Sequence, residues 1–417
     1  MKKVIVCYAS AGIGHQRAAE AIAESLVRMR RGHVRVSLLD ALDQTNRLCH
    51  FLYPATYLFF VHYLPTVWGG LYYLCDWKPL RPLVRGLRRW LNRFNSRRLV
   101  DYLLKERPDV VICTHFFSEE VIADLKQRGL FHGKLITVIT DFGLHDFWVE
   151  PEVDHYIVAT EATKAELKGR GISSEKVVVL GIPVRQAFSR RLDRQELFGK
   201  LGLQSGVLTG LITSGGFGVG PILSMVREFG RFPHPFQLLV VCGKNPRLTE
   251  RVRKLTQKLK NPAFVYGYVT NMDELMDVAD FIITKSGGLT SSEALAKELP
   301  MLLVRPIPGQ EGKNAALLVR QGAALQVRSL GHLHEILREI LHSPHRLWSM
   351  QQQIKEISRP KASEAVAHFL FHRYLHMDGG GFVRRERRQR PRAGQGHSPV
   401  IGDQPSAIRG PSPSPSS

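Results

Sequence analysis

Residues 284–314 read TKSGGLTSSEALAKELPMLLVRPIPGQEGKN, and the rest of the chain is organised around this stretch. The apolar run Phe281–Ile283 predicts a strand that ends at the small-residue turn 286–288, and 291–297 has the composition of a helix. The backbone N–H groups at such a helix start have no intrahelical partner, so they can hold a phosphate. Glu293 falls in the first turns of this helix. We therefore expect a phosphate site with a carboxylate beside it.

Amide and carboxylate side chains stand at the end of the same stretch. Gln310, Glu311 and Asn314 follow the next apolar strand-like run. Side chains of these types exchange hydrogen bonds with sugar hydroxyls. A phosphate site beside hydroxyl-binding groups predicts a nucleotide sugar as the ligand.

Strands and helices alternate along the chain. Strands are expected at 3–8, 34–39, 109–113, 134–139, 155–159 and 176–180, with helices at 16–31, 119–128 and 161–170, and strands resume at 207–213, 237–242 and 281–284. This alternation predicts the α/β class, with two doubly wound Rossmann-like domains facing a cleft. The expected parts are an N-terminal domain at 1–185, a hinge at 186–204, a C-terminal domain at 205–345, closing helices at 346–376 and a disordered, basic, Pro/Ser-rich tail at 377–417.

Composition and charge limit the function classes. The five cysteines, an odd number without a Cys-x-x-Cys motif, are expected to be reduced and structural, as in a cytosol. An excess of 58 Lys and Arg over 37 Asp and Glu gives a net charge of +21 and implies an anionic partner. Nucleic acid, membrane lipid and a phosphorylated substrate are the candidates, and the location of the charge decides among them.

The segment 48–100 carries the most informative charge pattern. Residues 48–74 hold many aromatic side chains and no Lys, Arg, Asp or Glu, but prolines and a Gly-Gly pair interrupt them, so a transmembrane helix is not expected. Residues 78–100 hold eight cations and no carboxylate among regularly spaced Leu, Trp and Phe, which predicts one cationic amphipathic helix. Its basic side chains either lie on an anionic membrane surface or form a solvated face. We favour the membrane over nucleic acid, because the uncharged and basic segments are adjacent.

The first turn of the chain offers a candidate base. Gly12-Ile13-Gly14-His15 resembles half of a dinucleotide fingerprint with Asp40 as a ribose acid, but the third glycine is missing, so a nicotinamide enzyme is disfavoured. His15 stands at a helix N-terminus, where the dipole favours the neutral ring that can accept a proton. It is therefore a candidate general base, or a histidine that packs at the turn.

A second polar cluster, 140–148, follows a strand and should line the same edge of the sheet. Its Asp141 is a candidate for orienting His145 or an acceptor hydroxyl, or for capping the turn. No Asp-x-Asp, zinc spacing, Gly-x-Ser-x-Gly or Walker motif occurs, which disfavours metal, hydrolase and P-loop chemistry.

Eight segments of the chain resemble one known family, the monogalactosyldiacylglycerol synthase and processive diacylglycerol glucosyltransferase family. It is related to the peptidoglycan N-acetylglucosaminyltransferase. The segments occur in family order: AGIGH at 11–15, TDFGLHDFW at 140–148, VLGIPVR at 179–185, SGGFGVG at 214–220, VCGKN at 241–245, YGYVTNM at 266–272, KSGGLTSSEAL at 285–295 and PIPGQEGKN at 306–314. They span nearly all of residues 1–325.

The resemblance implies a GT-B fold and inverting, metal-independent transfer from a UDP-sugar to a lipid hydroxyl, with no cofactor. Carried over by position, the diphosphate would be held by Ser286, Gly287, Gly288, Leu289 and Thr290, the ribose by Glu293, and the sugar by Gln310 and Glu311, with Asn314 closing the donor site. Arg185, Gly215, Gly216, Asn245 and Tyr268 would complete the uridine and diphosphate pocket. His15 and Asp141 would be catalytic, while Gly14, His145 and Trp148 match positions near the lipid acceptor.

The leading hypothesis is a peripheral glycosyltransferase at the cytoplasmic face of the cell membrane. It would move glucose or galactose from UDP onto diacylglycerol or a related lipid, with no nucleic acid partner. The alternatives are N-acetylglucosamine transfer to a polyprenyl-linked lipid, a UDP-sugar epimerase and a non-catalytic UDP-sugar sensor. Ser286 stands where many relatives have proline, which leaves the choice of sugar and of acceptor open.

Overall fold

The protein is described by a computed structural model over residues 1–10, 12–29, 34–218, 220–232, 234–304, 306–343 and 345–375, with the backbone alone at 47, 54, 57, 58, 61 and 62. The expected tail at 377–417 lies outside the described residues, as do Ala11 and Val219 of the family segments.

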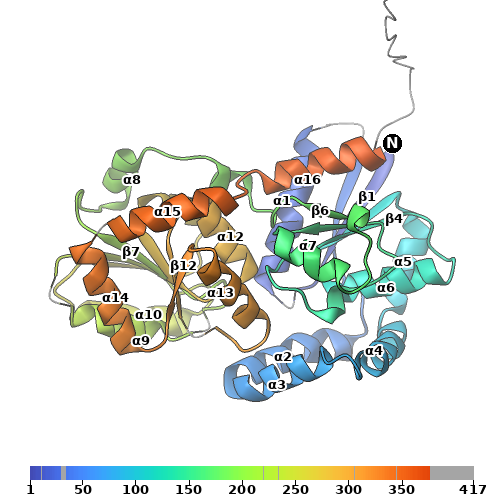
Figure 1. The fold of residues 1–417 in the computed structure, drawn as a ribbon, viewed down its shortest axis with the longest axis horizontal. Coiled ribbons are helices and arrows are strands. Elements are labelled where there is room, and N and C mark those ends of the chain that lie inside the picture. The colour runs from blue at the N-terminus through green and yellow to red at the C-terminus, as the bar shows by residue number, and fades with distance from the viewer. Residues whose placement is uncertain are drawn as a thin grey trace, which may run out of the picture. The chain divides into compact units, whose positions relative to one another are not determined.

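Two parallel sheets of six strands form the framework (Figure 1). The first has the order β2-β1-β3-β4-β5-β6 and contains β1 (Lys2–Tyr8), β2 (Val34–Asp40), β3 (Val110–Cys113), β4 (Lys134–Val138), β5 (His155–Val158) and β6 (Val177–Val179). The second has the order β12-β11-β10-β7-β8-β9 and contains β7 (Thr209–Thr213), β8 (Gln237–Val241), β9 (Ala263–Tyr266), β10 (Phe281–Thr284), β11 (Met301–Val304) and β12 (Ala324–Val327). This confirms the predicted α/β class with two Rossmann-like domains.

Helices connect consecutive strands and cover the sheets. The first domain uses α1 (Ile13–Met29), α6 (Phe116–Gln127) and α7 (Glu161–Lys168); the second uses α8 (Arg194–Leu201), α9 (Ile222–Gly230), α10 (Pro246–Thr256), α11 (Met272–Val278), α12 (Gly288–Ala296), α13 (Gln310–Arg320) and α14 (Leu330–His342). Strands covered on both faces are mostly apolar, and every residue of β3 and β10 is buried.

The strand orders determine where a ligand can bind. In the first sheet β1 lies between β2 and β3, and in the second β7 lies between β10 and β8. The chain therefore reverses its winding direction at β1/β3 and at β7/β10, and the loops that leave these pairs open a crevice at the carboxyl ends of the strands. Both crevices contribute to one cleft, described below.

Two helices, α15 (His345–Ile357) and α16 (Ala362–Leu370), follow the second domain. Ile354 of α15 packs in the core of the second domain. Val366 and Leu370 of α16 pack in the first domain, on the same core cluster as Ile22 of α1. Figure 1 shows α16 beside α1. The last part of the described chain thus packs against both domains and connects them.

Four helices are inserted between β2 and β3: α2 (Arg47–Tyr63), α3 (Pro65–Cys75), α4 (Arg81–Asn95) and α5 (Arg97–Glu106). The expected single basic helix over 78–100 is wrong, because the chain turns at the buried Ser96. That turn lets Leu99 and Leu103 of α5 enter the core of the first domain. Over the part of the chain that the structure describes, no helix is both long and apolar enough to cross a membrane.

The orientation of α4 is the reverse of the expected one. Arg88 forms an ion pair with the buried Glu120 at 2.6 Å, Arg89 with the buried Glu150 at 2.6 Å, and Arg93 with Asp124 at 2.5 Å. Arg85 donates to the carbonyl oxygen of Val149 at 2.8 Å. Arg88 and Arg89 therefore do not present their charge to a membrane as expected, because carboxylates of α6 and of the chain before β5 attract them inward, whereas Arg93 stays half exposed.

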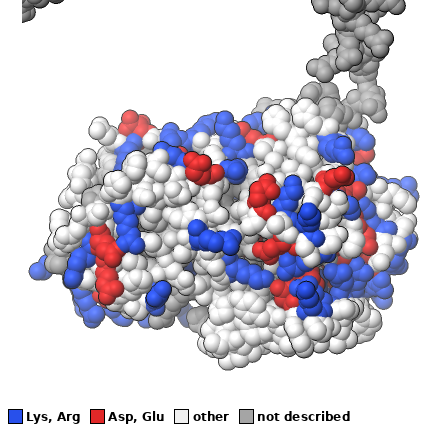
Figure 2. All heavy atoms as spheres, in the orientation of Figure 1, with Lys and Arg blue, Asp and Glu red and all other residues white. Residues whose placement is uncertain are grey.

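The outward face of α4 is apolar instead. Its exposed side chains follow one stripe of the helix at spacings of three and four residues: Leu83 is 70% exposed, Leu87 57%, Trp90 66%, Leu91 43% and Phe94 64%. Figure 2 shows that the neighbouring surface over α2 and α3 is almost free of charge. An exposed apolar surface of this extent marks an interaction site.

Candidate active site

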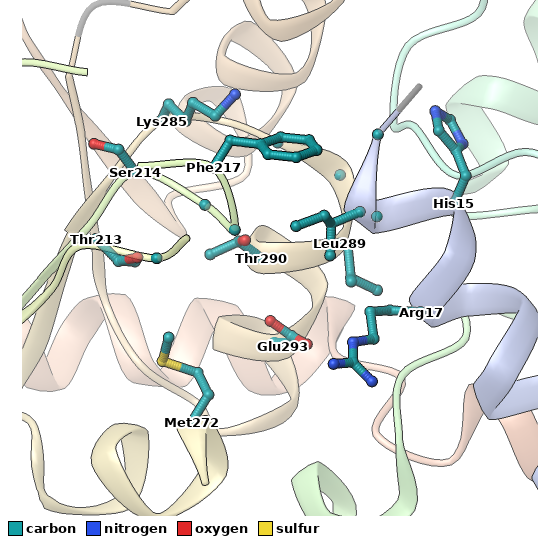
Figure 3. Close-up of a pocket in the computed structure, with 18 of the residues that line it drawn as sticks. His15, Arg17, Thr213, Ser214, Phe217, Met272, Lys285, Leu289, Thr290 and Glu293 are labelled. Atoms are coloured by element: carbon teal, nitrogen blue, oxygen red, sulfur yellow. The ribbon is translucent and has the colours of Figure 1, made fainter. Parts of the chain in front are cut away.

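A cleft between the two sheets collects the loops that leave β1, β4, β7, β8 and β10 (Figure 3). His15 and Arg17 from α1 lie on one side, and Phe217, Thr290 and Glu293 from the second domain lie on the other. Both crevices predicted by the strand orders therefore open into one cavity.

The start of α12 forms the floor of the cavity on the second domain. Gly287 is the N-cap residue and has no side chain to occupy the first N–H groups of the helix. Gly288 allows a close approach between domains, because a Cβ there would lie 2.0 Å from the carbonyl oxygen of Thr140. The free N–H groups and the positive end of the helix dipole thus face the cavity, as an anion site requires.

His15 is held in one orientation at the start of α1. Its Nδ1 lies 2.8 Å from the carbonyl oxygen of Thr114 and 2.8 Å from Oγ1 of Thr140. A carbonyl can only accept, so Nδ1 carries the hydrogen and Nε2 keeps the lone pair. Burial lowers the pKa of His15 to about 4, although the hydrogen bond to Thr114 opposes this shift. The ring is therefore neutral at pH 7, with Nε2 as its proton acceptor.

A second histidine supports the first. The ring of His115 packs edge-on against His15 with centroids 4.6 Å apart, and its Nδ1 accepts from the N–H of Phe117 at 3.1 Å. Burial lowers the pKa of His115 well below its usual value, and the neighbouring His15 lowers it further. Two neutral rings in contact avoid the repulsion that two imidazolium ions would cause.

Asp141 lies at the junction of the domains. Its Oδ1 accepts from Nδ2 of Asn314 at 3.1 Å, and its Oδ2 accepts from Nε2 of Gln310. Burial raises the pKa of Asp141 to about 6 despite these two hydrogen bonds. The carboxyl group that was expected to orient an acceptor therefore also joins the domains.

Asn314 is fully buried and uses its whole amide for this junction. Its oxygen accepts from the N–H groups of Phe142 at 2.9 Å and Gly143 at 3.2 Å, while its nitrogen donates to Asp141 and to the carbonyl oxygen of Ser286 at 3.0 Å. No donor or acceptor of the amide is left for a sugar.

Glu293 lies in α12 and lines the cavity. Burial raises its pKa to about 7, although Arg185 and Arg17 stabilise the charged form. Arg185 itself donates to the carbonyl oxygen of Thr270 at 3.0 Å. A carboxylate near two cations, one helix turn from the anion site, is placed to accept from ribose hydroxyls.

Several residues that line the cavity were not predicted from the sequence. Arg17 hydrogen-bonds to the hydroxyl of Tyr268 across the cleft, and Lys285 pairs with Glu311 at 2.7 Å. A cation in the first turns of a helix opposes the helix dipole, which was a usable signal for Arg17. The others that were missed are Gly12, Ile13, Thr140, Thr213, Ser214, Phe217, Val241, Gly243, Val269 and Met272.

The cavity brings together most of the predicted site residues. Those lining it are Gly14, His15, Asp141, Arg185, Gly215, Gly216, Tyr268, Gly287, Gly288, Leu289, Thr290, Glu293, Gln310 and Glu311. Five lie outside its lining: Asn245, Ser286, Asn314, His145 and Trp148. Asn245 caps α10, Ser286 donates to the carbonyl oxygen of Glu311 at 2.6 Å, and His145 contacts the carbonyl oxygen of Tyr72 at 3.1 Å. Trp148 is buried, with its ring centroid 6.5 Å from that of His15.

Two Rossmann-like domains with one cavity between them have the GT-B architecture, and two family models identify the chain as a glycosyltransferase. Residues 15–184 match the family model described as monogalactosyldiacylglycerol (MGDG) synthase, and residues 222–366 match the glycosyltransferase family 28 C-terminal domain. The enzyme class predicted from the sequence is thereby confirmed.

Similar proteins extend this match over most of the chain. It is 31% identical to the processive diacylglycerol β-glucosyltransferase of Bacillus cereus over 365 residues, which is 87% of this chain and 92% of the relative. It is 31% identical to the enzyme of the same name from Bacillus cytotoxicus over 369 residues, 88% and 92% of the two chains. The chain therefore belongs to the monogalactosyldiacylglycerol synthase and processive diacylglycerol glucosyltransferase family.

Solved structures share the fold at low identity. MurG of Acinetobacter baumannii aligns with a TM-score of 0.59 at 15% identity, covering 89% of this chain and all of MurG. The UDP-GlcNAc 2-epimerase of Neisseria meningitidis aligns with a TM-score of 0.57 at 15% identity, covering 89% and 100%. Transferases and epimerases thus share this architecture, so the fold alone does not separate them.

Proposed function

We propose that this protein transfers glucose or galactose from a UDP-sugar to the hydroxyl group of diacylglycerol or a related membrane lipid. The observation that carries the proposal is the neutral His15, which faces the anion-binding start of α12 across one cavity. The names of the relatives support diacylglycerol as the acceptor. The exposed apolar helices of the first domain support an acceptor that resides in a membrane.

The donor would lie along the second domain. The N–H groups of 288–290 would hold the diphosphate, Glu293 the ribose, and Gln310 with Glu311 the sugar. Tyr268, Gly215 and Gly216 would border the uridine and the diphosphate. Asn245, Ser286 and Asn314 would act by holding these segments in place, because their side chains contact protein groups.

Transfer would be inverting and direct. The acceptor oxygen attacks the anomeric carbon, its proton passes to Nε2 of His15, and the bond from the anomeric carbon to the diphosphate breaks with its electron pair on UDP. The anion site and the cations Arg17, Arg185 and Lys285 would stabilise the leaving charge, so no step requires a metal or a cofactor. The bound diphosphate would also raise the pKa of His15 from about 4, because a nearby negative charge favours imidazolium.

The acceptor would reach His15 from the side of the inserted helices. Gly14 borders the cavity, and His145, which contacts Tyr72 of α3, and Trp148, whose ring centroid lies 6.5 Å from that of His15, would lie behind this approach. Asp141 would orient the acceptor hydroxyl with the oxygen lone pairs that Gln310 and Asn314 leave available.

The protein would bind the cytoplasmic face of the cell membrane as a peripheral protein. The apolar stripe of α4 and the exposed side chains of α2 and α3 would enter the interface, while Lys78, Arg97 and Arg98 would contact anionic headgroups from its edge. Membrane attachment would thus rest on apolar insertion, with a smaller electrostatic contribution.

The decisive experiment is a product assay. The protein is incubated with labelled UDP-glucose, UDP-galactose and UDP-N-acetylglucosamine in parallel, in vesicles containing diacylglycerol or a polyprenyl phosphate lipid. We expect a labelled glycosyl diacylglycerol from one of the two hexoses. Labelled polyprenyl lipid, an epimerised soluble sugar, or UDP-sugar binding without any product would each refute the proposal in favour of a different activity.

A further inference from the structure

Helix α3 has two faces with different surroundings. Val67, Leu71 and Leu74 are 45%, 43% and 48% exposed and belong to the uncharged surface of the first domain. Gly69 on the opposite face is buried, and Tyr72 follows it at a spacing of three residues. The inner face contacts residues 306–313, called here the sugar segment because its Gln310 and Glu311 line the donor cavity.

The backbones of α3 and the sugar segment approach closely at two glycines. A Cβ on Gly69 would lie 2.5 Å from Cβ of Pro308, and one on Gly309 would lie 2.8 Å from the ring of Tyr72. Gly309 also has a φ of 102°, a conformation that side-chain-bearing residues rarely adopt. The ring of Tyr72 therefore occupies the space where a residue other than glycine would place its side chain.

An ion pair also joins the end of α3 to the sugar segment. Nζ of Lys313 donates to Oδ2 of Asp76 at 3.1 Å and to the carbonyl oxygen of Leu144 at 2.7 Å, and it lies 5.6 Å from the ring centroid of Tyr72. Asp76 also pairs with Arg81 at 3.3 Å. The side chains of Lys313 and Asp76 are 25% and 13% exposed, so water screens this ion pair only partly.

The other side of the sugar segment faces the donor cavity. Oε1 of Glu311 accepts from Lys285 at 2.7 Å and its Oε2 accepts from the N–H of Ile307 at 3.0 Å, while Gln310 donates to Asp141. The segment is thus held between the donor cavity and a helix whose far side is exposed and apolar. A shift of α3 would move the groups that are proposed to hold the sugar.

We infer that Tyr72 and Asp76 of α3 are positioning residues for the sugar end of the donor, and that membrane contact at the outer face of α3 tightens UDP-sugar binding. The inference rests on the proposed function, because it assumes a UDP-sugar donor and a membrane-bound α3. It concerns the sugar end of the donor, because α3 contacts the sugar segment, which contains Gln310 and Glu311, and not the helix start of α12 or Glu293.

The test compares two ligands that differ only in the sugar. The dissociation constants of UDP and of UDP-glucose and UDP-galactose are measured by titration calorimetry for the wild type and Lys313→Met, with and without vesicles of phosphatidylcholine and phosphatidylglycerol. Lys313→Met keeps the aliphatic stem and removes the contact with Asp76. We expect it to weaken binding of the preferred UDP-sugar by about fivefold or more, the range of typical coupling energies, and to leave UDP unchanged.

Two further variants separate positioning from a general loss of structure. Lys313→Arg should restore the affinity for the UDP-sugar, because it keeps the ion pair. Lys254→Met, at an exposed lysine of α10 that pairs with Glu250, is the matched control and should bind like the wild type. Equal losses for UDP and UDP-sugar, or none, in Lys313→Met would overturn the positioning role.

The measurements with vesicles test whether membrane contact changes the affinity for the UDP-sugar. Vesicles should tighten UDP-sugar binding to the wild type severalfold and should not do so for Lys313→Met. Sedimentation with the same vesicles reports membrane binding independently. If the wild type sediments and its UDP-sugar affinity is unchanged, the coupling is overturned, whereas failure to sediment refutes the proposed membrane surface instead.

Discussion

Replacing the aromatic residues on the outward face of α4 should release the protein from membranes. Trp90 and Phe94 are 66% and 64% exposed. Aromatic side chains present roughly 150–250 Å² each, so about 100–160 Å² of apolar surface is available on each residue. At about 25 cal/mol per Å², complete transfer from water is worth roughly 2.5–4 kcal/mol per residue. If half of this area enters the interface, the two residues together contribute about 2.5–4 kcal/mol, which corresponds to a change in vesicle affinity of at least about 50-fold.

The assay is vesicle sedimentation of the double variant Trp90→Gln/Phe94→Gln, since glutamine preserves helix propensity. Neutral phosphatidylcholine vesicles and high salt remove the electrostatic contribution. We expect the wild type to stay bound under these conditions and the variant to be released. A wild type that binds anionic vesicles alone, and dissociates in about 1 M salt, would refute insertion through the apolar stripe.

Arginines on α4 and beyond it provide the controls. Arg97→Gln/Arg98→Gln removes exposed cations and should weaken binding to anionic vesicles by about 1 kcal/mol per residue, with no effect on neutral ones. Arg88→Gln should instead lower the free energy of unfolding, by about 3 kcal/mol, because it leaves the buried Glu120 without its ion pair. The folded fraction of this variant should still bind vesicles.

Three further predictions concern the titratable groups. His15→Ala should lower kcat by about 100-fold or more while UDP binding in calorimetry stays unchanged, and an unchanged rate would remove His15 from the mechanism. Because the pKa of Glu293 is raised to about 7, its accepting carboxylate is lost as the pH falls through that value. Uridine, which has no phosphate to titrate, should bind up to about tenfold more weakly per pH unit below it, and Glu293→Gln should abolish this dependence. Glu119 is fully buried, and this burial raises its pKa well above 4.5. The folded state therefore keeps a proton that the unfolded state releases, and the wild type loses about 1.4 kcal/mol per pH unit above the unfolded pKa until the folded pKa is reached. Glu119→Gln should melt like the wild type near pH 4.5 and at a higher temperature at pH 7, and an equal difference at both pH values would contradict this assignment.

Much of the fold could be predicted because local composition determines it. Buried parallel strands are apolar on both faces, and the glycine turns after β7 and β10 mark where the chain leaves each sheet. The strand, turn and helix start of the proposed anion site were predictable for the same reason, because β10, the turn at 286–288 and α12 follow one another directly along the chain. His15 was visible as a histidine in the first turn of α1.

The orientation of α4 could not be predicted from its own residues. The helix carries an apolar stripe and a basic stripe, and the usual preference places the apolar one inward. Here Glu120 and Asp124 on α6, and Glu150 before β5, form the opposing surface and attract the arginines. These carboxylates lie about 30–60 residues further along the chain, so only the tertiary structure shows that they meet α4.

The arrangement of the two crevices explains why the junction at Asn314 is needed. The anion site belongs to the β7/β10 crevice and His15 to the β1/β3 crevice, so neither domain contains both groups that the proposed reaction requires. The distance between His15 and the anion site therefore depends on contacts between the domains. The amide of Asn314 makes four hydrogen bonds at one buried point, three of them to the first domain and one to its own domain. A polar group that is buried and fully bonded holds its partners in a fixed geometry, because any displacement leaves unsatisfied groups. We therefore expect Asn314 to affect the proposed reaction through the distance between His15 and α12, and not through a contact with the sugar.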